Sequence, residues 1–212
     1  MHPHAVLDLL GPGDVRPAYG RRIRSLANTV SSFTLHLAMR PGSFPYLDHN
    51  IYHHDLPGVW DAVEYDVADW PSAYMLSTPM SSRSPTHAEA VTVMTYMRYE
   101  EWEPWAASAN TVTTPGDRPD GYTAFKHAKE QQLLDAVERR FPGIRSCVRS
   151  IHSSTPLSFR DYIGTADGSM YGIRKESADP LRTFIAPRTK VPNLLLTGQN
   201  LNLHGLLGVT VG

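Results

Sequence analysis

The sequence predicts an α+β fold, in which a mostly antiparallel sheet is flanked by helices. Several stretches alternate apolar and polar residues with a period of two, which is typical of half-buried strands. One long stretch instead repeats its apolar positions at helical spacing. The 212 residues also include 17 Pro and 15 Gly, so the chain contains many turns, and this composition argues against a plain helical bundle.

The two clearest predicted strands lie in the first half of the chain. Residues 29–39 and 90–99 show the clearest alternation of apolar and polar side chains. Shorter strands are predicted at residues 61–65, 73–78, 150–157, 183–186 and 192–198. The last of these is predicted to be buried, because Leu194, Leu195 and Leu196 form a continuous apolar run before a glycine turn.

The clearest predicted helix covers residues 122–141. Asp120 is a suitable N-cap for it, and Pro142 and Gly143 end it. Its apolar stripe consists of Tyr122, Phe125, Leu133, Leu134, Val137 and Phe141. The charged residues of this segment, Lys129 among them, lie mostly off the stripe. A short helical turn is predicted at residues 5–10, and a glycine-rich helix begins at Gly205.

Composition and charge exclude several classes of protein. Twenty Lys and Arg against 21 Asp and Glu give a formal charge of −1, which argues against a nucleic-acid-binding protein with its usual basic stripe. No run reaches the roughly 18 apolar residues of a membrane-spanning helix, and the N-terminus lacks the pattern of a secretory signal. We therefore expect a cytoplasmic protein, for which peripheral contact with a membrane and the oligomeric state stay open.

The C-terminus is unusual for a natural chain end. It stops inside an apolar, glycine-punctuated run over residues 203–212, whereas the last residues of a domain are usually polar and frayed. We therefore expect the sequence to be an internal piece of a longer protein. A natural chain with a short C-terminal helix is the alternative.

Histidine, serine and cysteine residues give no strong candidate for metal binding or nucleophilic catalysis. His49, His53 and His54 lie beside two aspartates, but local hydrogen bonds in a strand and loop explain them better, so no metal is predicted. No Gly-x-Ser-x-Gly motif anchors a hydrolase triad. The single cysteine, Cys147, excludes an internal disulfide framework, and a small packing residue is a better interpretation of it than a reactive thiol.

The most informative segment is residues 192–212, where a strand, a tight turn and a glycine-rich helix start follow one another. A helix start of this kind exposes unpaired backbone N–H groups. Its small residues let a flat or phosphorylated ligand approach the backbone. A buried helix that packs through its glycines explains these residues equally well.

A series of short motifs in the last third of the chain resembles one flavoprotein family. That family comprises the phytoene desaturases, carotenoid isomerases and retinol saturases, within the amine-oxidase-like group. The motifs are TPLSFRDY at 155–162, GSMYG at 168–172, PRT at 187–189, PNL at 192–194 and TGQ at 197–199, followed by Gly205 and Gly208. The stretches at 32–35 and 60–65 are more similar to the saturases and isomerases than to the desaturases. The resemblance covers nearly the whole chain and is most specific from Thr155 onward.

The resemblance implies FAD as cofactor, held between an N-terminal dinucleotide fold and a C-terminal strand-turn-helix. The Gly-x-Gly-x-x-Gly motif of the dinucleotide fold is missing from this chain, because residues 11–13 have no third glycine after them and no strand before them. The implied domains are an incoming segment of the FAD domain at 1–28, a substrate-binding domain at 29–182 and a truncated C-terminal part of the FAD-binding domain at 183–212. The implied cofactor-binding residues are Gly198, Gln199, Asn200, Gly205, Leu206, Leu207 and Gly208.

The resemblance also implies the substrate and the type of reaction. The substrate is a hydrophobic polyene such as a carotenoid or retinoid, and the chain is a fragment of an FAD-dependent oxidoreductase that reduces, desaturates or isomerises C=C bonds. Side chains suited to an adaptable apolar tunnel are Phe33, Met75, Met94, Tyr96, Met97 and Tyr99, although ordinary sheet core explains each of them singly. A non-enzymatic isoprenoid- or lipid-binding module without its own flavin site is the alternative function.

No catalytic acid or base is assigned, because in such enzymes the flavin carries out the redox chemistry and the protein mainly positions the substrate. Arg160, Asp161 and Tyr162 are candidates for shaping the flavin end of the tunnel. A purely structural contact between Arg160 and Asp161 is an equally good interpretation.

Overall fold

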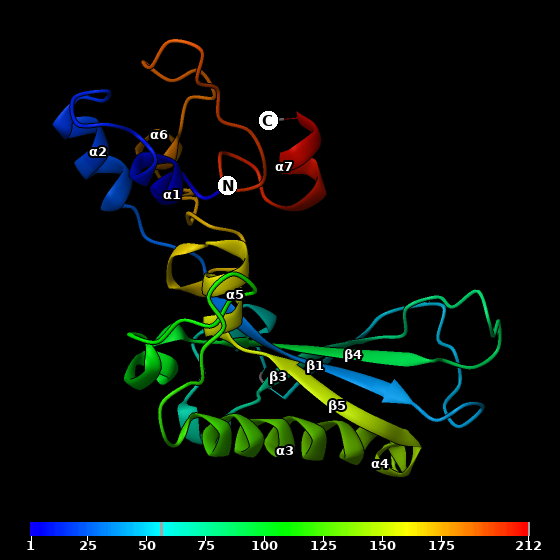
Figure 1. Cartoon of the computed structure of the whole chain (residues 1–212). Helices are drawn as coiled ribbons and strands as arrows, with labels where there is room; N and C mark the ends of the chain where they lie inside the picture. Colours follow the sequence, from blue (N-terminus) through cyan, green and yellow to red (C-terminus); the bar gives the residue numbers. More distant parts are fainter. Residues whose placement is uncertain (56, 212) are drawn as a thin grey trace. The chain divides into compact units, whose positions relative to one another are not determined.

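The computed structural model describes residues 1–55 and 57–211, without the side-chain surroundings of residues 207, 208 and 211. The chain divides into two compact units (Figure 1). We call residues 32–155 the sheet unit, and residues 1–31 together with 156–212 the terminal unit. These boundaries differ from the predicted ones at 28/29 and 182/183, and the assignment of the parts to FAD-binding and substrate-binding domains stays a prediction.

The sheet unit is built on one five-stranded sheet with the order β2-β3-β4-β1-β5. Its strands are β1 (Ser31–Met39), β2 (Ile51–His54), β3 (Ala73–Ser77), β4 (Ala90–Met97) and β5 (Val148–Ser154). The pairs β1–β5, β2–β3 and β3–β4 are antiparallel. The structure therefore confirms the predicted α+β class and the strands predicted at 29–39, 73–78, 90–99 and 150–157.

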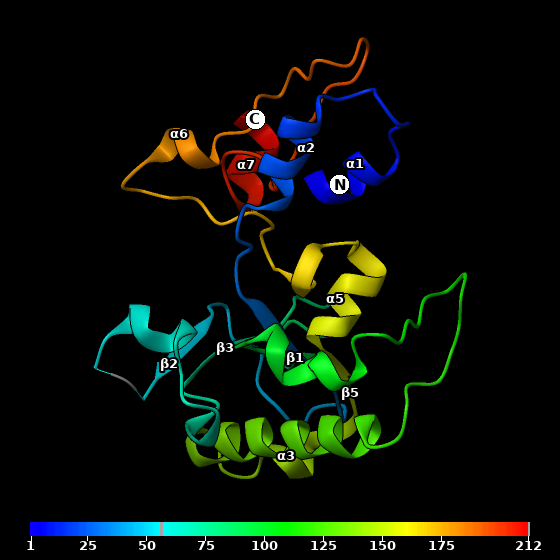
Figure 2. The same ribbon diagram turned by 90° about the vertical axis from the view of Figure 1, so that its left-hand side faces the viewer.

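Helix α3 (Tyr122–Arg140) covers one face of this sheet (Figure 2). Its predicted stripe is confirmed at its centre, where Leu133, Leu134 and Val137 are buried. The predicted N-cap is wrong: Gly121 occupies that position with φ of 82°, a left-handed conformation that glycine adopts at little cost. Asp120 precedes it, and its carbonyl accepts a hydrogen bond from Trp105 Nε1 at 3.1 Å.

The core of the sheet unit lies between α3 and the strands. Alternate residues of β1 and β4 are buried toward the helix; they are Phe33, Leu35, Leu37, Val91, Val93 and Met97. Trp102 links the two layers, because its ring lies 6.2 Å from that of Phe33 and 5.0 Å from that of Phe125 on α3. Short elements complete the unit: α4 (Ile144–Cys147) and the 3-10 helices η1 (Val59–Val63), η2 (Val67–Asp69) and η3 (Tyr99–Trp105).

Three of the predicted strands are absent from the described residues. Residues 61–65 fall mostly in the 3-10 helix η1. Residues 183–186 form no strand. Thr183 is the last residue of the short helix α6 (Pro180–Thr183), and Pro180 at the first helical position favours this helix. Residues 192–198 make one isolated bridge, Arg188 with Leu195, since the positive φ of Asn193 (64°) turns the chain and no strand in the described part pairs with this segment.

The terminal unit consists of short helices around a small core. In addition to α6 they are α1 (Pro3–Asp8), α2 (Pro17–Arg24), α5 (Pro156–Ile163), the 3-10 helix η4 (Ala166–Gly168) and α7 (Gly205–Val211). The core contains Ile23, Ile173, Ile185 and Leu201. The predicted helical turn near residue 5 and the helix from Gly205 are confirmed. None of the helices described is long and apolar enough to cross a membrane.

His2 is a buried titratable residue of the terminal unit. Its Nε2 lies 2.9 Å from Asn28 Oδ1, and Asn28 Nδ2 donates to Asp167 Oδ2 at 2.9 Å. Burial is the largest influence on this imidazole and lowers its pKa from 6.5 to about 4, although the contact with Asn28 opposes the shift. The folded chain therefore disfavours the protonated form of His2.

We expect the chain to lose stability as the pH falls from 6.5 to about 4, because the unfolded chain then binds a proton at His2 that the folded chain excludes. Above this window both states are neutral at His2, and below it the loss is complete, on the order of 3 kcal/mol. His2→Gln should remove this contribution. Urea unfolding of both proteins at pH 7.5 and pH 4.5 measures it, and equal losses in the two proteins would contradict the assignment.

Candidate functional site

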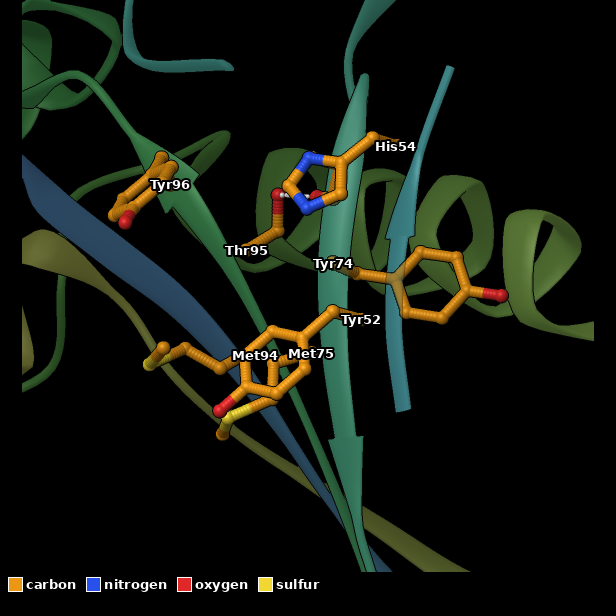
Figure 3. Close-up of a pocket in the computed structure, with 8 residues that line it drawn as sticks. Tyr52, His54, Tyr74, Met75, Met94, Thr95 and Tyr96 are labelled. Carbon is orange, nitrogen blue, oxygen red and sulfur yellow. Dashed lines mark hydrogen bonds between the residues drawn. The ribbon is translucent and has the colours of Figure 1, made fainter. Parts of the chain in front are cut away.

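The sheet face that points away from α3, which we call the open face, carries a shallow pocket (Figure 3). It encloses about 370 Å³, including the part open to solvent. The residues that line it come from β2, β3 and β4, and they are Tyr52, His54, Ala73, Tyr74, Met75, Met94, Thr95 and Tyr96. The pocket therefore lies entirely within the sheet unit.

Strand register explains why these side chains meet. Met75 on β3 is paired with Tyr52 on β2 and with Met94 on β4. Directly opposite residues of antiparallel strands project from the same face, so the three side chains converge, as Figure 3 shows. Tyr96 lies two residues further along β4 and therefore on the same face.

The pocket offers an apolar and polarisable surface. Two thioethers and two phenol rings form most of it, and such groups adapt to ligands of irregular shape. The hydroxyl of Thr95 donates to the Ala73 carbonyl at 2.6 Å (Figure 3), so this polar group is satisfied within the sheet. The ring of Tyr74 belongs to the opposite face of the sheet, because Tyr74 alternates with Met75 along β3; there it lies 4.9 Å from the ring of His53, and burial raises the pKa of its phenol. The surface thus suits a hydrophobic ligand better than a charged one.

The structure brings together only half of the predicted tunnel residues. Met75, Met94 and Tyr96 share the pocket, but Phe33 and Met97 are fully buried on the opposite face, beneath α3. Tyr99 is the first residue of η3 and lies outside the sheet. Tyr52 and His54 were not predicted to line a site, although the alternation in residues 51–54 places them on one face of a strand.

The histidine cluster forms local pairs. His49 Nδ1 lies 2.7 Å from Asp48, and His53 Nε2 lies 2.8 Å from Asp55. In the part of the chain that the structure describes, no group of three or more His, Cys, Asp or Glu side chains could hold a metal ion. Cys147 is partly exposed, and its thiol donates to the Ser43 carbonyl at 3.1 Å.

The glycines of the GSMYG motif have packing roles. A Cβ on Gly168 would lie 2.1 Å from the Pro156 carbonyl oxygen, and one on Gly172 would lie 2.2 Å from Asn200 Oδ1. Both residues also have positive φ. Gly168 and Gly172 therefore allow the motif to pack closely against Pro156 and Asn200 of the terminal unit.

The turn at residues 198–205 has a different character. Gly198 (φ 108°) and Gly205 (φ 68°) have open space where a side chain would project, with nothing within 4 Å of an added Cβ. Asn200 is buried, and its Oδ1 has no hydrogen-bond partner among the described residues. Leu206 is 87% exposed. The two glycines and Leu206 leave room for a ligand beside the turn, whereas Asn200 Oδ1 is buried against Gly172.

The remaining predicted cofactor residues are less open to such a ligand or fall outside the description. Gln199 Nε2 donates to the Met170 carbonyl at 3.4 Å. Leu207 and Gly208 belong to α7, but their surroundings lie outside the described residues. Arg160 and Asp161 lie on α5 and form an ion pair at 2.7 Å, which is the predicted structural contact, and Tyr162 follows them on the same helix.

A buried ion pair in the sheet unit was not predicted from the sequence. Lys129 on α3 lies 2.9 Å from Glu101 of η3, and both side chains are almost fully buried. Tyr65 donates its phenol proton to the same carboxylate, and the N–H of Arg98 donates to the Tyr65 oxygen at 2.8 Å. Burial raises the pKa of Tyr65. The Lys129 ammonium also lies 4.5 Å from the centre of the Trp70 ring, so this cluster ties α3 to the sheet.

Comparison with known proteins gives relatives of one kind. No family model matches the chain. It is 34% identical over 97 residues to an all-trans-retinol 13,14-reductase of Danio rerio, which covers 42% of this chain. It is 27% identical over 100 residues, or 46% of this chain, to the enzymes of the same name from Homo sapiens and Rattus norvegicus. The match spans only 16% of the length of each relative.

Proposed function

We propose that this chain is part of an FAD-dependent oxidoreductase that acts on polyene isoprenoids, and that the open face of the sheet lines the substrate. The observation that carries the proposal is the convergence of Tyr52, Met75 and Met94 on one apolar pocket of the sheet. It occurs in a chain whose relatives are named for reducing a double bond of retinol. The reduction of a retinoid double bond is therefore the first reaction to consider.

The pocket would bind such a substrate mainly through the hydrophobic effect. A polyene is long, flat and apolar, and the methionine and tyrosine side chains of the open face can adjust to its shape. Burial of about 100 Å² of apolar surface would contribute roughly 2.5 kcal/mol. The role of these residues is to bind and orient the chain of double bonds.

The turn at residues 198–205 fits the implied cofactor. Gly198 and Gly205 leave the backbone open to a flat group, because nothing lies within 4 Å of a Cβ added at either position. FAD would supply the hydride or electron transfer, and Gly198, Gly205 and the exposed side chain of Leu206 would hold it. Gln199, Leu207 and Gly208 remain the other predicted contacts.

We expect Met94→Glu to weaken the binding of all-trans-retinol by tenfold or more, because the carboxylate would have to lose its water to accommodate an apolar ligand. A tenfold change corresponds to about 1.4 kcal/mol of binding free energy. The chain contains 4 Trp, so energy transfer from tryptophan to bound retinol measures the affinity directly. Met94 is half-buried and faces the pocket, so the fold can accept a polar group there.

Met80→Glu is the matched control, because Met80 is 82% exposed and lies outside the pocket. It should bind retinol as tightly as the parent chain. Circular dichroism checks that both variants are folded. Retinol binding that is equal in all three proteins, or absent from the parent chain, would show that the open face is not the substrate surface.

A further inference from the structure

The terminal unit has an excess of basic residues. It carries ten Lys and Arg against six Asp and Glu, whereas the sheet unit carries ten against fifteen. Six of the basic residues belong to two neighbouring segments, α2 and residues 174–182, and four of them, Arg22, Arg174, Lys175 and Arg182, form the cluster considered below. The near-neutral charge of the whole chain therefore conceals a local basic cluster.

A polar pocket lies within this cluster. It encloses about 550 Å³, including the part open to solvent, and is lined by Ser25, Leu26, Ala27, Arg174, Glu176, Arg182 and Thr183. The backbone fixes its walls, because the N–H of Arg174 donates to the Ala27 carbonyl at 2.8 Å. Thr183 is buried, and its hydroxyl oxygen accepts the N–H of Glu176 at 3.2 Å.

Carbonyl groups, and not carboxylates, hold the cations beside this pocket. Arg22 donates to the carbonyls of Arg182 and Phe184, at 3.1 and 2.6 Å. Lys175 Nζ lies 3.3 Å from the Thr183 carbonyl. Across residues 1–55 and 57–211, none of the four basic side chains has a carboxylate at ion-pair distance. In the part of the chain that the structure describes, no ion pair neutralises these four side chains, and Glu176 is the carboxylate that lines the pocket with them.

The crowding of these cations has an energetic cost that an anion would relieve. Burial, and then the charge of Arg22, lower the pKa of Lys175 to about 8. Glu176 is the one acidic residue among those that line the pocket. Two exposed guanidinium groups, those of Arg174 and Arg182, remain available at its rim.

We propose that this pocket binds a phosphate group, carried either by a lipid headgroup or by a soluble phosphorylated ligand. Guanidinium groups bind phosphate oxygens through paired N–H donors, and two of them can share one phosphate. Leu181 and Phe184 are exposed beside the pocket, where they could enter the headgroup region of a bilayer if a lipid supplies the phosphate. The proposal is independent of the polyene and flavin functions, because it concerns other residues.

The test uses the whole chain with two probes, inorganic pyrophosphate and vesicles of phosphatidylcholine with or without phosphatidic acid. We expect saturable binding of pyrophosphate, weakened about tenfold or more in the double variant Arg174→Gln/Arg182→Gln, since charge-assisted hydrogen bonds are lost. Glu176→Gln should bind severalfold more tightly than the parent, because it removes the one negative charge of the lining.

The matched control is Arg16→Gln/Arg188→Gln, which removes two exposed charges from the same unit outside the pocket. In about 0.15 M salt it should change the affinity for pyrophosphate less than twofold, because the salt screens charges that lie outside the pocket. If a lipid supplies the phosphate, the chain sediments with phosphatidic acid vesicles and pyrophosphate competes. If a soluble ligand supplies it, pyrophosphate binds but the vesicles do not. Equal weakening in the two double variants, or no saturable binding of either probe, would overturn the proposal.

Discussion

Glu101→Leu is expected to lower the free energy of unfolding by roughly 3–5 kcal/mol, because it leaves the Lys129 ammonium buried without its partner. Both members of the pair are almost fully buried and lie 2.9 Å apart. The contact of Lys129 with the Trp70 ring cannot replace the lost carboxylate, since a cation over an aromatic ring contributes only about 0.5–2 kcal/mol. Lys129→Met should cost a similar amount, because it leaves the buried carboxylate without a counter-charge and with only the Tyr65 phenol as a donor.

The double variant Glu101→Leu/Lys129→Met separates the cost of an unpaired charge from the value of the pair. It should be much closer in stability to the parent than either single variant, with about 1 kcal/mol lost because Tyr65 has no acceptor. Urea unfolding followed by tryptophan fluorescence gives all four values, and Tyr65→Phe measures the phenol contact by itself. If the loss of unfolding free energy in the double variant equals the sum of the losses in the two single variants, the two charges do not interact.

The strands and the main helix could be predicted because their signals are local. From the sequence alone, alternation locates β1 and β4, and helical spacing locates α3, to within a few residues of their observed ends. The three absent strands show what such signals lack. A strand requires a neighbour, and the apolar run at residues 194–196 has none in the described chain apart from a single bridge, so its residues form turns instead.

The buried ion pair could not be predicted for a related reason. Lys129 lies four residues from both Phe125 and Leu133, in line with the apolar stripe, but the composition of a single charged position does not say whether its ammonium reaches solvent or is buried with a partner. It is buried because η3 brings Glu101 against it. No sequence pattern encodes a contact between these two residues, which are 28 positions apart. A single charged residue at the edge of a stripe looks the same whether or not such a partner exists.

The candidate site was partly predictable. Period-two alternation divides the side chains of a strand between two faces, but it does not say which face the helix covers. Met94 and Met97, which project from opposite faces of β4, were therefore both predicted to line the tunnel, whereas the structure places Met94 on the open face and Met97 in the core. Burial resolves the choice only after the position of α3 is known.

Val137→Asp is expected to have the largest effect on stability in the sheet unit. Val137 lies on α3 with its side chain completely buried against the sheet. The aspartate would lose its water without gaining a partner, and the packing of the valine would be lost as well, so the cost should exceed about 4 kcal/mol. At typical domain stabilities of about 5–15 kcal/mol, such a loss unfolds a large fraction of the chain or makes it insoluble.

Val112→Asp is the matched control, because Val112 is 83% exposed in the loop before α3. The same change in chemistry there should alter the free energy of unfolding by less than about 0.5 kcal/mol. Thermal unfolding followed by circular dichroism at 222 nm reports directly on α3, to which most of the helical signal of the sheet unit belongs. If Val137→Asp melts at the temperature of the parent, this face of α3 is not part of the core, and the buried stripe that orders the two layers of the sheet unit must lie elsewhere on the helix.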